Sequence, residues 1–284
     1  MVIQKKRRRY SGGKNLSNSN RVINIISNRN YESRNTKIKL IDILEEEGFV
    51  PTEEYNPNAE LNICIGGDGA FLRSIHKHKF PNIPFIGINT GHLGFFQEIS
   101  PTNMKDFVDR YANKEYTVEE IHLVEANVCT KKKCFTLTGI NEIVIKGIKS
   151  KVVHLTMYIN SNHLQKFCGD GIIISTPVGS TAYNFSSGGS IIYPTLQSLQ
   201  VTPLSPISSK AYRSLPTSIV IPGELPIQIK PEFRYENSIL IVNDGMEFRY
   251  DDIEEIVLKI SDKKVYKINL SKNVYWENLK SKFL

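Results

Sequence analysis

The sequence has no long uninterrupted apolar run, and no stretch of about 18 residues has the composition of a membrane-spanning helix. Positive charges lie near the beginning of the chain, but the apolar segment that follows such charges in a secretion signal is missing. From these two absences we expect a soluble, cytoplasmic protein without a membrane partner.

Metal-binding patterns are missing as well. The cysteines form no C-x-x-C pair, and no histidine stands at zinc-finger spacing from them. His76 and His78 are two positions apart and so do not share a helix face, which disfavours a metal pair. We expect no fixed metal site on the protein, and surface positions for these two histidines. We also expect reduced, mostly buried thiols at all four cysteines: Cys64, Cys129, Cys134 and Cys168.

The excess of positive charge is confined to the N-terminus. The formal net charge is +7, from 36 Lys and Arg against 29 Asp and Glu. Most of this excess comes from six residues of the segment 1–20: Lys5, Lys6, Arg7, Arg8, Arg9 and Lys14. A basic run in a polar, Ser/Asn/Gly-rich segment is usually a solvated, disordered tail and less often an arm for nucleic acid. We expect a disordered tail over 1–20 and no nucleic-acid partner.

Residues 21–120 alternate apolar runs with helical patterns. Three runs have the pattern of buried strands: RVINIIS (21–27), LNICI (61–65) and PFIGIN (84–89). A helix is predicted after each strand. The first is marked by Ile38, Ile41 and Leu44, and the second is AFLRSIHKH (70–78). The third is capped by Ser100-Pro101 and has one apolar face, formed by Met104, Phe107, Val108 and Tyr111. This alternation predicts an α/β N-terminal domain with a parallel, doubly wound sheet.

Near residue 120 the apolar period changes to the spacing of a half-buried strand, as in Val153, Leu155, Met157 and Ile159. Later strand-like segments are TSIVIP (217–222), LPIQIKP (225–231), SILIVN (238–243), EEIVLKI (254–260) and KVYKINL (264–270). We expect an all-β sandwich domain over 121–270, with an irregular crossover at 194–206. The C-terminal segment 271–284 is expected to be a helix that packs back on the first domain.

The stretch LNICIGGDG places three glycines around one carboxylate at the end of a predicted strand. Gly66, Gly67 and Gly69 leave backbone amides accessible to phosphate at the start of a helix. Asp68 would repel phosphate, unless it binds Mg²⁺ or accepts a proton from an attacking hydroxyl. Both roles indicate phosphoryl transfer, while the structural alternative is that Asp68 only caps the helix. Walker A and dinucleotide-fingerprint spacings are absent.

Three further polar segments carry possible ligand contacts. GINTGHLGFF (87–96) again turns tightly after a strand, which by itself is a weak signal. The stretch 169–190 opens from an apolar strand into hydroxyls, glycines and Tyr183, suited to a ribose and an aromatic base, or else to a polar hairpin loop. Asn141-Glu142 offers an amide and a carboxylate for a ribose or adenine, although alone it is an ordinary strand start.

Taken together, four motifs in one order closely resemble the NAD kinase family, particularly its Gram-positive-type members: GGDG (66–69), GINTGHLGF (87–95), NE (141–142) and DGIIISTPVGSTAYN (170–184). The segments 206–222 and NDG (243–245) are similar to that family too. The resemblance implies transfer of a phosphoryl group from ATP or polyphosphate, with Mg²⁺ or another divalent cation, to the 2′-hydroxyl of the adenosine ribose of NAD. It also implies a homodimer or homotetramer, with sites at the subunit interface.

The resemblance further implies roles for particular residues. Asp68 would be the catalytic base. Asn141 and Glu142 would hold the sugar and base of NAD, and Asp170 a nucleoside held mainly by a neighbouring subunit. The other expected binding residues are Gly67, Gly69, Arg73, Cys168, Val178, Thr181, Ala182, Tyr183, Asn184, Phe185 and Ser186. Val178 and Cys168 depart from the family, which often has a hydroxyl at the first position and a basic residue at the second.

Two alternatives stay open at this point. A lipid kinase of the diacylglycerol or sphingoid type shares a GGDGT-like motif, but here Ala70 replaces the threonine and the TPVGSTAY block (176–183) favours a nucleotide. A nucleotide-sensing or nucleic-acid-associated protein without catalysis would use the basic tail, and its nucleic-acid binding would be sensitive to salt.

Overall fold

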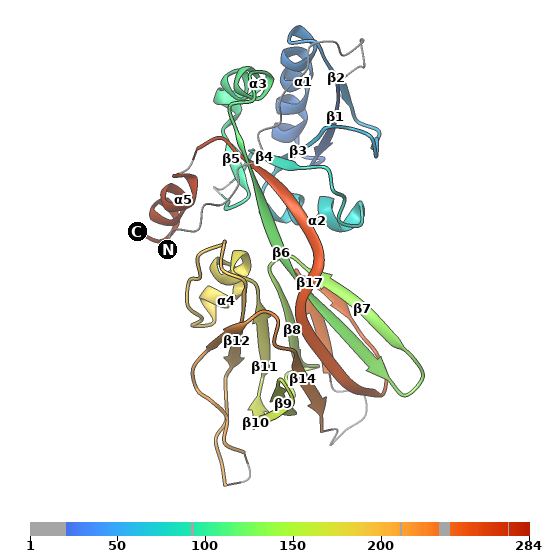
Figure 1. Cartoon of the computed structure of the whole chain (residues 1–284), viewed down its shortest axis with the longest axis vertical. Helices are drawn as coiled ribbons and strands as arrows, with labels where there is room; N and C mark the ends of the chain where they lie inside the picture. Colours follow the sequence, from blue (N-terminus) through green and yellow to red (C-terminus); the bar gives the residue numbers. More distant parts are fainter. Residues whose placement is uncertain (1–20, 92–93, 211, 233–238, 272) are drawn as a thin grey trace, which may run out of the picture.

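The structure is a computed structural model, which describes residues 21–91, 94–210, 212–232, 239–271 and 273–284. The basic tail predicted over 1–20 lies outside the described residues. Figure 1 shows an elongated molecule with an α/β part at one end and antiparallel strands at the other. Two long strands, β6 (Thr117–Thr130) and β17 (Ile253–Asn269), run between the two ends.

The α/β part contains a parallel sheet with helices on both faces, as the alternating pattern predicts. Strands β2, β1, β3 and β4 pair in parallel in that order, and β5 also pairs with β4. The elements are β1 (Arg21–Ser27), α1 (Tyr31–Glu46), β2 (Phe49–Thr52), β3 (Leu61–Gly66), α2 (Asp68–Lys77), β4 (Phe85–Asn89), β5 (Gln97–Ile99), a 3₁₀ turn (Pro101–Asn103) and α3 (Met104–Ala112).

The two faces of this sheet have separate apolar cores. Leu40 and Leu44 of α1, together with the buried face of α3, pack against one face. Phe71 and Ile75 of α2 pack against the other, and both side chains are fully buried. Burial of two such side chains contributes roughly 3–6 kcal/mol, so the helix that begins at Asp68 is firmly attached. One detail of the prediction is wrong: Ile38 is 57% exposed, because α1 turns Leu40 rather than Ile38 toward the sheet.

The antiparallel part is a sandwich of two sheets around a third core. One sheet has the order β13-β12-β11-β8-β15-β16, and the other contains β10, β9, β14, β17, β6 and β7. The remaining elements are β7 (Cys134–Gly139), β8 (Glu142–Gly147), β9 (Val153–Ile159), β10 (Asn162–Gly169), β11 (Gly171–Ser175), a 3₁₀ turn (Val178–Thr181), α4 (Tyr183–Ser186), β12 (Ser198–Leu204), β13 (Ile219–Pro222), β14 (Ile227–Pro231), β15 (Ile239–Asn243), β16 (Met246–Phe248) and α5 (Val274–Phe283).

Two expectations about this part need correction. EEIVLKI and KVYKINL are one strand, β17, because its pairing with β6 continues past a register shift between Ile260 and Lys264. The predicted crossover at 194–206 contains β12, which pairs with β11 and β13. The α/β sheet and one sheet of the sandwich are continuous, since β17 also pairs with β4 through Lys267 and Phe85. The predicted domain boundary near residue 120 falls within β6 and stays a prediction.

The expectation of four reduced cysteines is wrong for one pair. Cys129 and Cys134 form a disulfide, because they lie directly opposite each other at the end of the β6–β7 hairpin with their Cα atoms 4.0 Å apart. Cys64 and Cys168 are buried and take no part in a disulfide with the described residues. Among the helices that the structure describes, none has the length and apolar character needed to cross a membrane.

Candidate active site

The glycine loop lies where β3 ends and α2 begins, at the carboxyl edge of the parallel sheet. Gly67 is the N-cap of α2 and makes no side-chain cap, so the first helical amides are open to a ligand. Gly66 lies close to Asn28, whose Nδ2 atom would be 2.8 Å from a methyl group added there. On the next turn of α2, Arg73 donates to Asn28 Oδ1 at 3.5 Å. The glycine loop therefore packs closely against Asn28, the residue that follows β1.

The Asp68 side chain does not cap its own helix, whose N-cap residue is Gly67. Its carboxylate turns to the neighbouring loop, where Oδ2 accepts from the Phe95 amide at 2.8 Å and Oδ1 from the Phe96 amide at 3.1 Å. Gly94 allows this approach: a methyl group there would lie 1.8 Å from Oδ1. Two backbone donors thus fix the orientation of a partly exposed carboxylate.

The C-terminal helix α5 reaches this carboxylate. Lys282 Nζ is 3.7 Å from Asp68 Oδ2 and lies 4.4 Å from the centre of the Phe95 ring. Beside it, Phe283 contacts the rings of Phe95 and Phe185, with ring-centre distances of 5.9 and 4.2 Å. Helix α5 therefore joins the α/β part to the α4 segment next to Asp68.

Asn141 and Glu142 lie at the start of β8, and both side chains are buried. Asn141 Oδ1 and Glu142 Oε2 have no hydrogen-bond partner among the described residues. Burial, and secondly the nearby Asp244 carboxylate, raise the pKa of Glu142 to about 8. Buried polar atoms are normally hydrogen-bonded, so these two open acceptors make Asn141 and Glu142 candidates for contact with a ligand.

The TPVGSTAY loop is packed directly on Asn141. Thr176 donates from its hydroxyl to the Ile140 carbonyl at 2.7 Å, and a methyl group on Gly179 would lie 2.0 Å from the Asn141 carbonyl oxygen. Tyr183 and Phe185 are 46% and 38% exposed, and Ser186 is also exposed. The loop thus brings Thr181, Ala182 and Tyr183 to the side of the sandwich that carries Asn141 and Glu142.

The side chain of Asn184 has a structural role in the loop. Its side chain is fully buried, where it donates to the Ser180 carbonyl at 3.1 Å and accepts from the Thr202 hydroxyl at 2.6 Å. Through these bonds the Asn184 side chain holds the loop in place. The assignment of Asn184 as a binding residue stays a prediction.

Cys168 and Asp170 are not brought together with Asp68. Asp170 immediately precedes β11, whose first residue pairs with Lys146 and whose last residue, Ser175, pairs with Glu142. At about 3.3 Å per residue, Asp170 lies roughly 16 Å along the strand from Ser175. Asp170 is exposed, whereas Cys168 is buried, with its amide donating to Ser214 Oγ.

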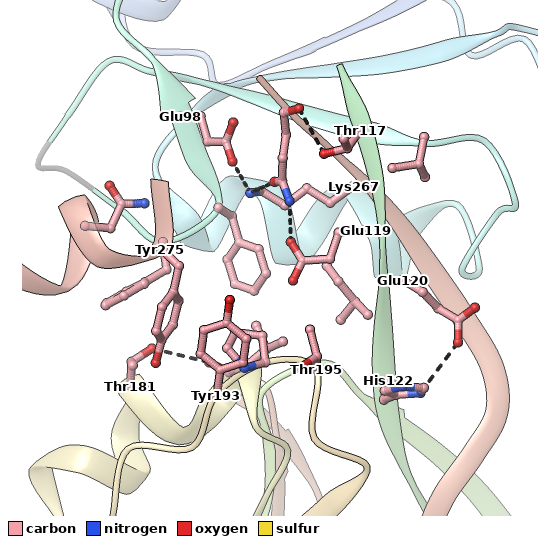
Figure 2. Close-up of a pocket in the computed structure, with 18 of the residues that line it drawn as sticks. Glu98, Thr117, Glu119, Glu120, His122, Thr181, Tyr193, Thr195, Lys267 and Tyr275 are labelled. Carbon is pink, nitrogen blue, oxygen red and sulfur yellow. Dashed lines mark hydrogen bonds and ion pairs between the residues drawn. The ribbon is translucent and has the colours of Figure 1, made fainter. Parts of the chain in front are cut away.

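A cavity of about 570 Å³ lies between the α/β part, the sandwich and α5. Figure 2 shows Tyr193 and Tyr275 at one side and Glu119 at the other, with Thr181 at the lower edge. Val178 and Thr181 are the predicted binding residues that line it, and Phe95 and Phe96 border it next to Asp68. At its upper wall, the buried Lys267 forms an ion pair with Glu98.

A second cavity, of about 450 Å³, lies at the end of β1. Asn28, which touches the glycine loop, belongs to its wall, and Tyr55 stacks on His78 at another part of the wall. Four cationic side chains border it: Arg29, Arg34, Lys37 and Lys77. Lys37 pairs with Glu53, whereas the other three form no ion pair with the described residues. This cavity therefore has an excess of positive charge beside the glycine loop.

Comparison with known proteins identifies the family. The profiles described as ATP-NAD kinase N-terminal domain and ATP-NAD kinase C-terminal domain match residues 14–116 and 140–270. An NAD kinase of Finegoldia magna is 46% identical over 275 residues, which cover 95% of this chain and 100% of the relative. The chain belongs to the NAD kinase family. The resemblance seen in the four motifs is confirmed, and the activity is that of an NAD kinase, a phosphotransferase.

Other relatives agree with this assignment. The NAD kinase of Streptococcus mutans is 33% identical over 270 residues, covering 92% of this chain and 94% of the relative. Yeast NADH kinase in complex with NADH has the same fold, with a TM-score of 0.80, 19% identity, and coverage of 93% of this chain and 87% of the other. The predicted fold class is confirmed, and the lipid-kinase and non-catalytic alternatives are not supported.

Sequence reasoning missed several residues that the structure of this NAD kinase places at the site. Gly94, Phe95 and Lys282 surround Asp68, and Asp244 supports Asn141 and Glu142. His76, expected at the surface, is instead half-buried against Asp244. Only the NDG motif and the 87–95 cluster carried a signal for any of these, through the family resemblance. Among the described residues no group of His, Cys, Asp and Glu could hold a metal ion.

Proposed function

We propose that Asp68 is the general base of this NAD kinase. The 2′-hydroxyl oxygen of the adenosine ribose of NAD attacks the terminal phosphorus of the donor, and the bond between that phosphorus and the leaving phosphate oxygen breaks. The hydroxyl proton passes to Asp68. The observation that carries this proposal is the orientation of the carboxylate, which is fixed by the Phe95 and Phe96 amides and is not used as a helix cap. A positioned base typically contributes about 10²–10⁴-fold.

Asn141 and Glu142 are proposed to bind the ribose and adenine of NAD. Their open oxygen atoms, Asn141 Oδ1 and Glu142 Oε2, would accept hydrogen bonds from ribose hydroxyls or the adenine amino group. The pKa of Glu142 of about 8 means that near neutral pH its carboxyl group also carries a proton to donate. Thr181, Ala182, Tyr183 and Ser186 are proposed to line the same pocket, with the exposed Tyr183 ring available for stacking.

The donor phosphates are proposed to bind at the glycine loop. The open amides at the start of α2 and the adjacent Gly67 and Gly69 favour an anion there. Arg73 and the cations of the second cavity, Arg29 and Arg34 among them, would bind the rest of the donor. Since no cluster of ligating side chains is found among the described residues, Mg²⁺ fits as an ion brought by the donor. When bound, it would neutralise phosphate charge.

Cys168 and Asp170 support the expectation of a homodimer or homotetramer. Within one chain, Asp170 precedes β11 and lies about 16 Å along the strand from Ser175, which pairs with Glu142, and Cys168 lies at the end of β10. A second subunit would bring its own exposed Asp170 to the substrate that contacts Asp68. The oligomer, like the cytoplasmic location, is part of the proposal.

The direct test crosses two donors with two acceptors. Purified enzyme is incubated with ATP or polyphosphate, in the presence of Mg²⁺, and with NAD or NADH, and NADP or NADPH is measured. We expect NADP from NAD with at least one donor, while diacylglycerol offered in place of NAD is not phosphorylated. No phosphorylated dinucleotide with any of the four combinations would contradict the proposal.

A further inference from the structure

A side-chain hydrogen bond joins the helix that carries Asp68 to the turn that supports Asn141 and Glu142. His76 lies on α2, eight residues after Asp68, or about 12 Å along the helix. Its Nε2 atom is 2.7 Å from Oδ2 of Asp244, which follows β15 in the sandwich. The two residues are 168 positions apart in the sequence. The contact therefore crosses between the α/β part and the sandwich.

The side chain of Asp244 is fully buried, and each of its carboxylate oxygens makes two hydrogen bonds. Oδ1 accepts from the Asn141 amide at 2.8 Å and the Glu142 amide at 3.2 Å. Oδ2 accepts from the Ile140 amide at 2.7 Å and from His76. The Asp244 amide in turn donates to the Glu142 carbonyl at 3.1 Å, which closes the arrangement. One carboxylate thus sets the path of the chain through Asn141 and Glu142.

His76 is held so that it has little freedom. Its side chain is 14% exposed, and its ring lies edge to face against Phe80, 5.0 Å away. Because an ionised carboxylate can only accept, Nε2 carries the hydrogen of this bond. The helix behind it is anchored by the buried Phe71 and Ile75, so any movement of α2 relative to the Asn141–Glu142 segment must stretch or break this bond.

We propose that His76 is a positioning residue for phosphoryl transfer: through Asp244 it sets the Asn141–Glu142 segment relative to α2, and hence the bound ribose relative to Asp68. The proposal rests on the function proposed above. This role explains why the buried Asp244 carboxylate takes its fourth hydrogen bond from His76 on helix α2, in the α/β part. A misplacement of about 1 Å between a base and a reacting hydroxyl costs roughly 10²-fold in rate, so one bond of this kind is sufficient to affect catalysis.

The test compares substitutions that keep or lose the donor at the Nε2 position. His76→Gln retains a donor of similar reach, His76→Asn retains an amide that is too short, and His76→Phe retains only the ring that packs on Phe80. The matched control is His163→Phe, an exposed histidine at the far end of the sandwich whose ring lies on Tyr158. For each variant, kcat and the KM values for NAD and ATP are measured, and the folded fraction is taken from urea unfolding at the assay temperature.

We expect kcat per folded molecule to fall about 10–100-fold in His76→Phe and His76→Asn, following the cost of a misplaced hydroxyl. His76→Gln should recover most of it, while KM for ATP and the activity of His163→Phe stay at wild-type values. Activity that falls only with the folded fraction, or equal losses in the Gln and Asn variants, would overturn the positioning role. If His76→Phe does not fold, the comparison of kcat per folded molecule between His76→Gln and His76→Asn tests the proposal. Absence of wild-type turnover would mark failure of the proposed function itself.

Discussion

Gly94→Ala tests the position of Asp68 without altering its chemistry. A methyl group on Gly94 would lie 1.8 Å from Oδ1 and 2.4 Å from Cγ of Asp68. Ordinary contact begins at 3.4 Å, so the carboxylate must withdraw by about 1.6 Å, and it then loses its hydrogen bonds to the Phe95 and Phe96 amides. Gly91→Ala is the control in the same loop, because a methyl group there meets nothing within 4 Å.

The displacement determines the expected size of the effect. Since a shift of about 1 Å in a catalytic group can cost roughly 10²-fold, we expect kcat of Gly94→Ala to fall at least about 10²-fold. The stability of the fold should change little, because Asp68 can turn toward solvent. The assay is steady-state NADP formation, with thermal melting as the check on folding. If Gly94→Ala turned over at the rate of Gly91→Ala while both were folded, a fixed Asp68 carboxylate would not be needed for catalysis.

Two other predictions concern the proposed binding residues. The pKa of Glu142 is raised from 4.5 to about 8, so the folded protein keeps this proton at pH values where the unfolded chain releases it. The bound proton therefore stabilises the fold fully below about pH 4.5, and this stabilisation is lost as the pH rises toward 8. Glu142→Gln should remove this loss of stability, which is measured as the difference between the free energies of unfolding in urea at pH 5 and at pH 8. An unchanged difference would contradict the raised pKa. Arg34→Met removes an unpaired cation from the second cavity and should raise KM for ATP about tenfold, the cost of one hydrogen bond to a charged group. KM for NAD should not change, and a rise confined to KM for NAD would place the donor elsewhere.

Local patterns were sufficient to predict most of the secondary structure. In RVINIIS and LNICI, apolar residues around Asn24 and Asn62 occupy both faces of the strand, because helices cover both faces of the sheet. Met104, Phe107, Val108 and Tyr111 mark the buried face of α3 without ambiguity. Pairing between distant segments could not be predicted in this way. The joining of two strand patterns into β17 depends on its long partner β6, and the Cys129–Cys134 disulfide depends on the register of a hairpin.

The candidate site was predictable where the residue type itself carries the chemistry. Asp68 among glycines could be selected from the sequence because a carboxylate in an anion-binding loop requires an explanation, whereas Asn141 and Glu142 were selected only through the family resemblance. His76 and Lys282 could not, since their importance depends on what a distant part of the chain places within 4 Å of them. The internal hydrogen bonds of Asn184 could not be predicted either, because its partners Ser180 and Thr202 are brought to its amide only by the fold.

The most direct test of the central claim is the turnover of Asp68→Asn at saturating NAD and ATP. The substitution preserves the size of the side chain and one acceptor oxygen for the Phe95 and Phe96 amides, but removes the group that accepts the proton. We predict that kcat for NADP formation falls about 10²–10⁴-fold while the Kd for NAD stays close to the wild-type value. A variant that forms NADP at the wild-type rate would contradict the assignment of Asp68 as the base.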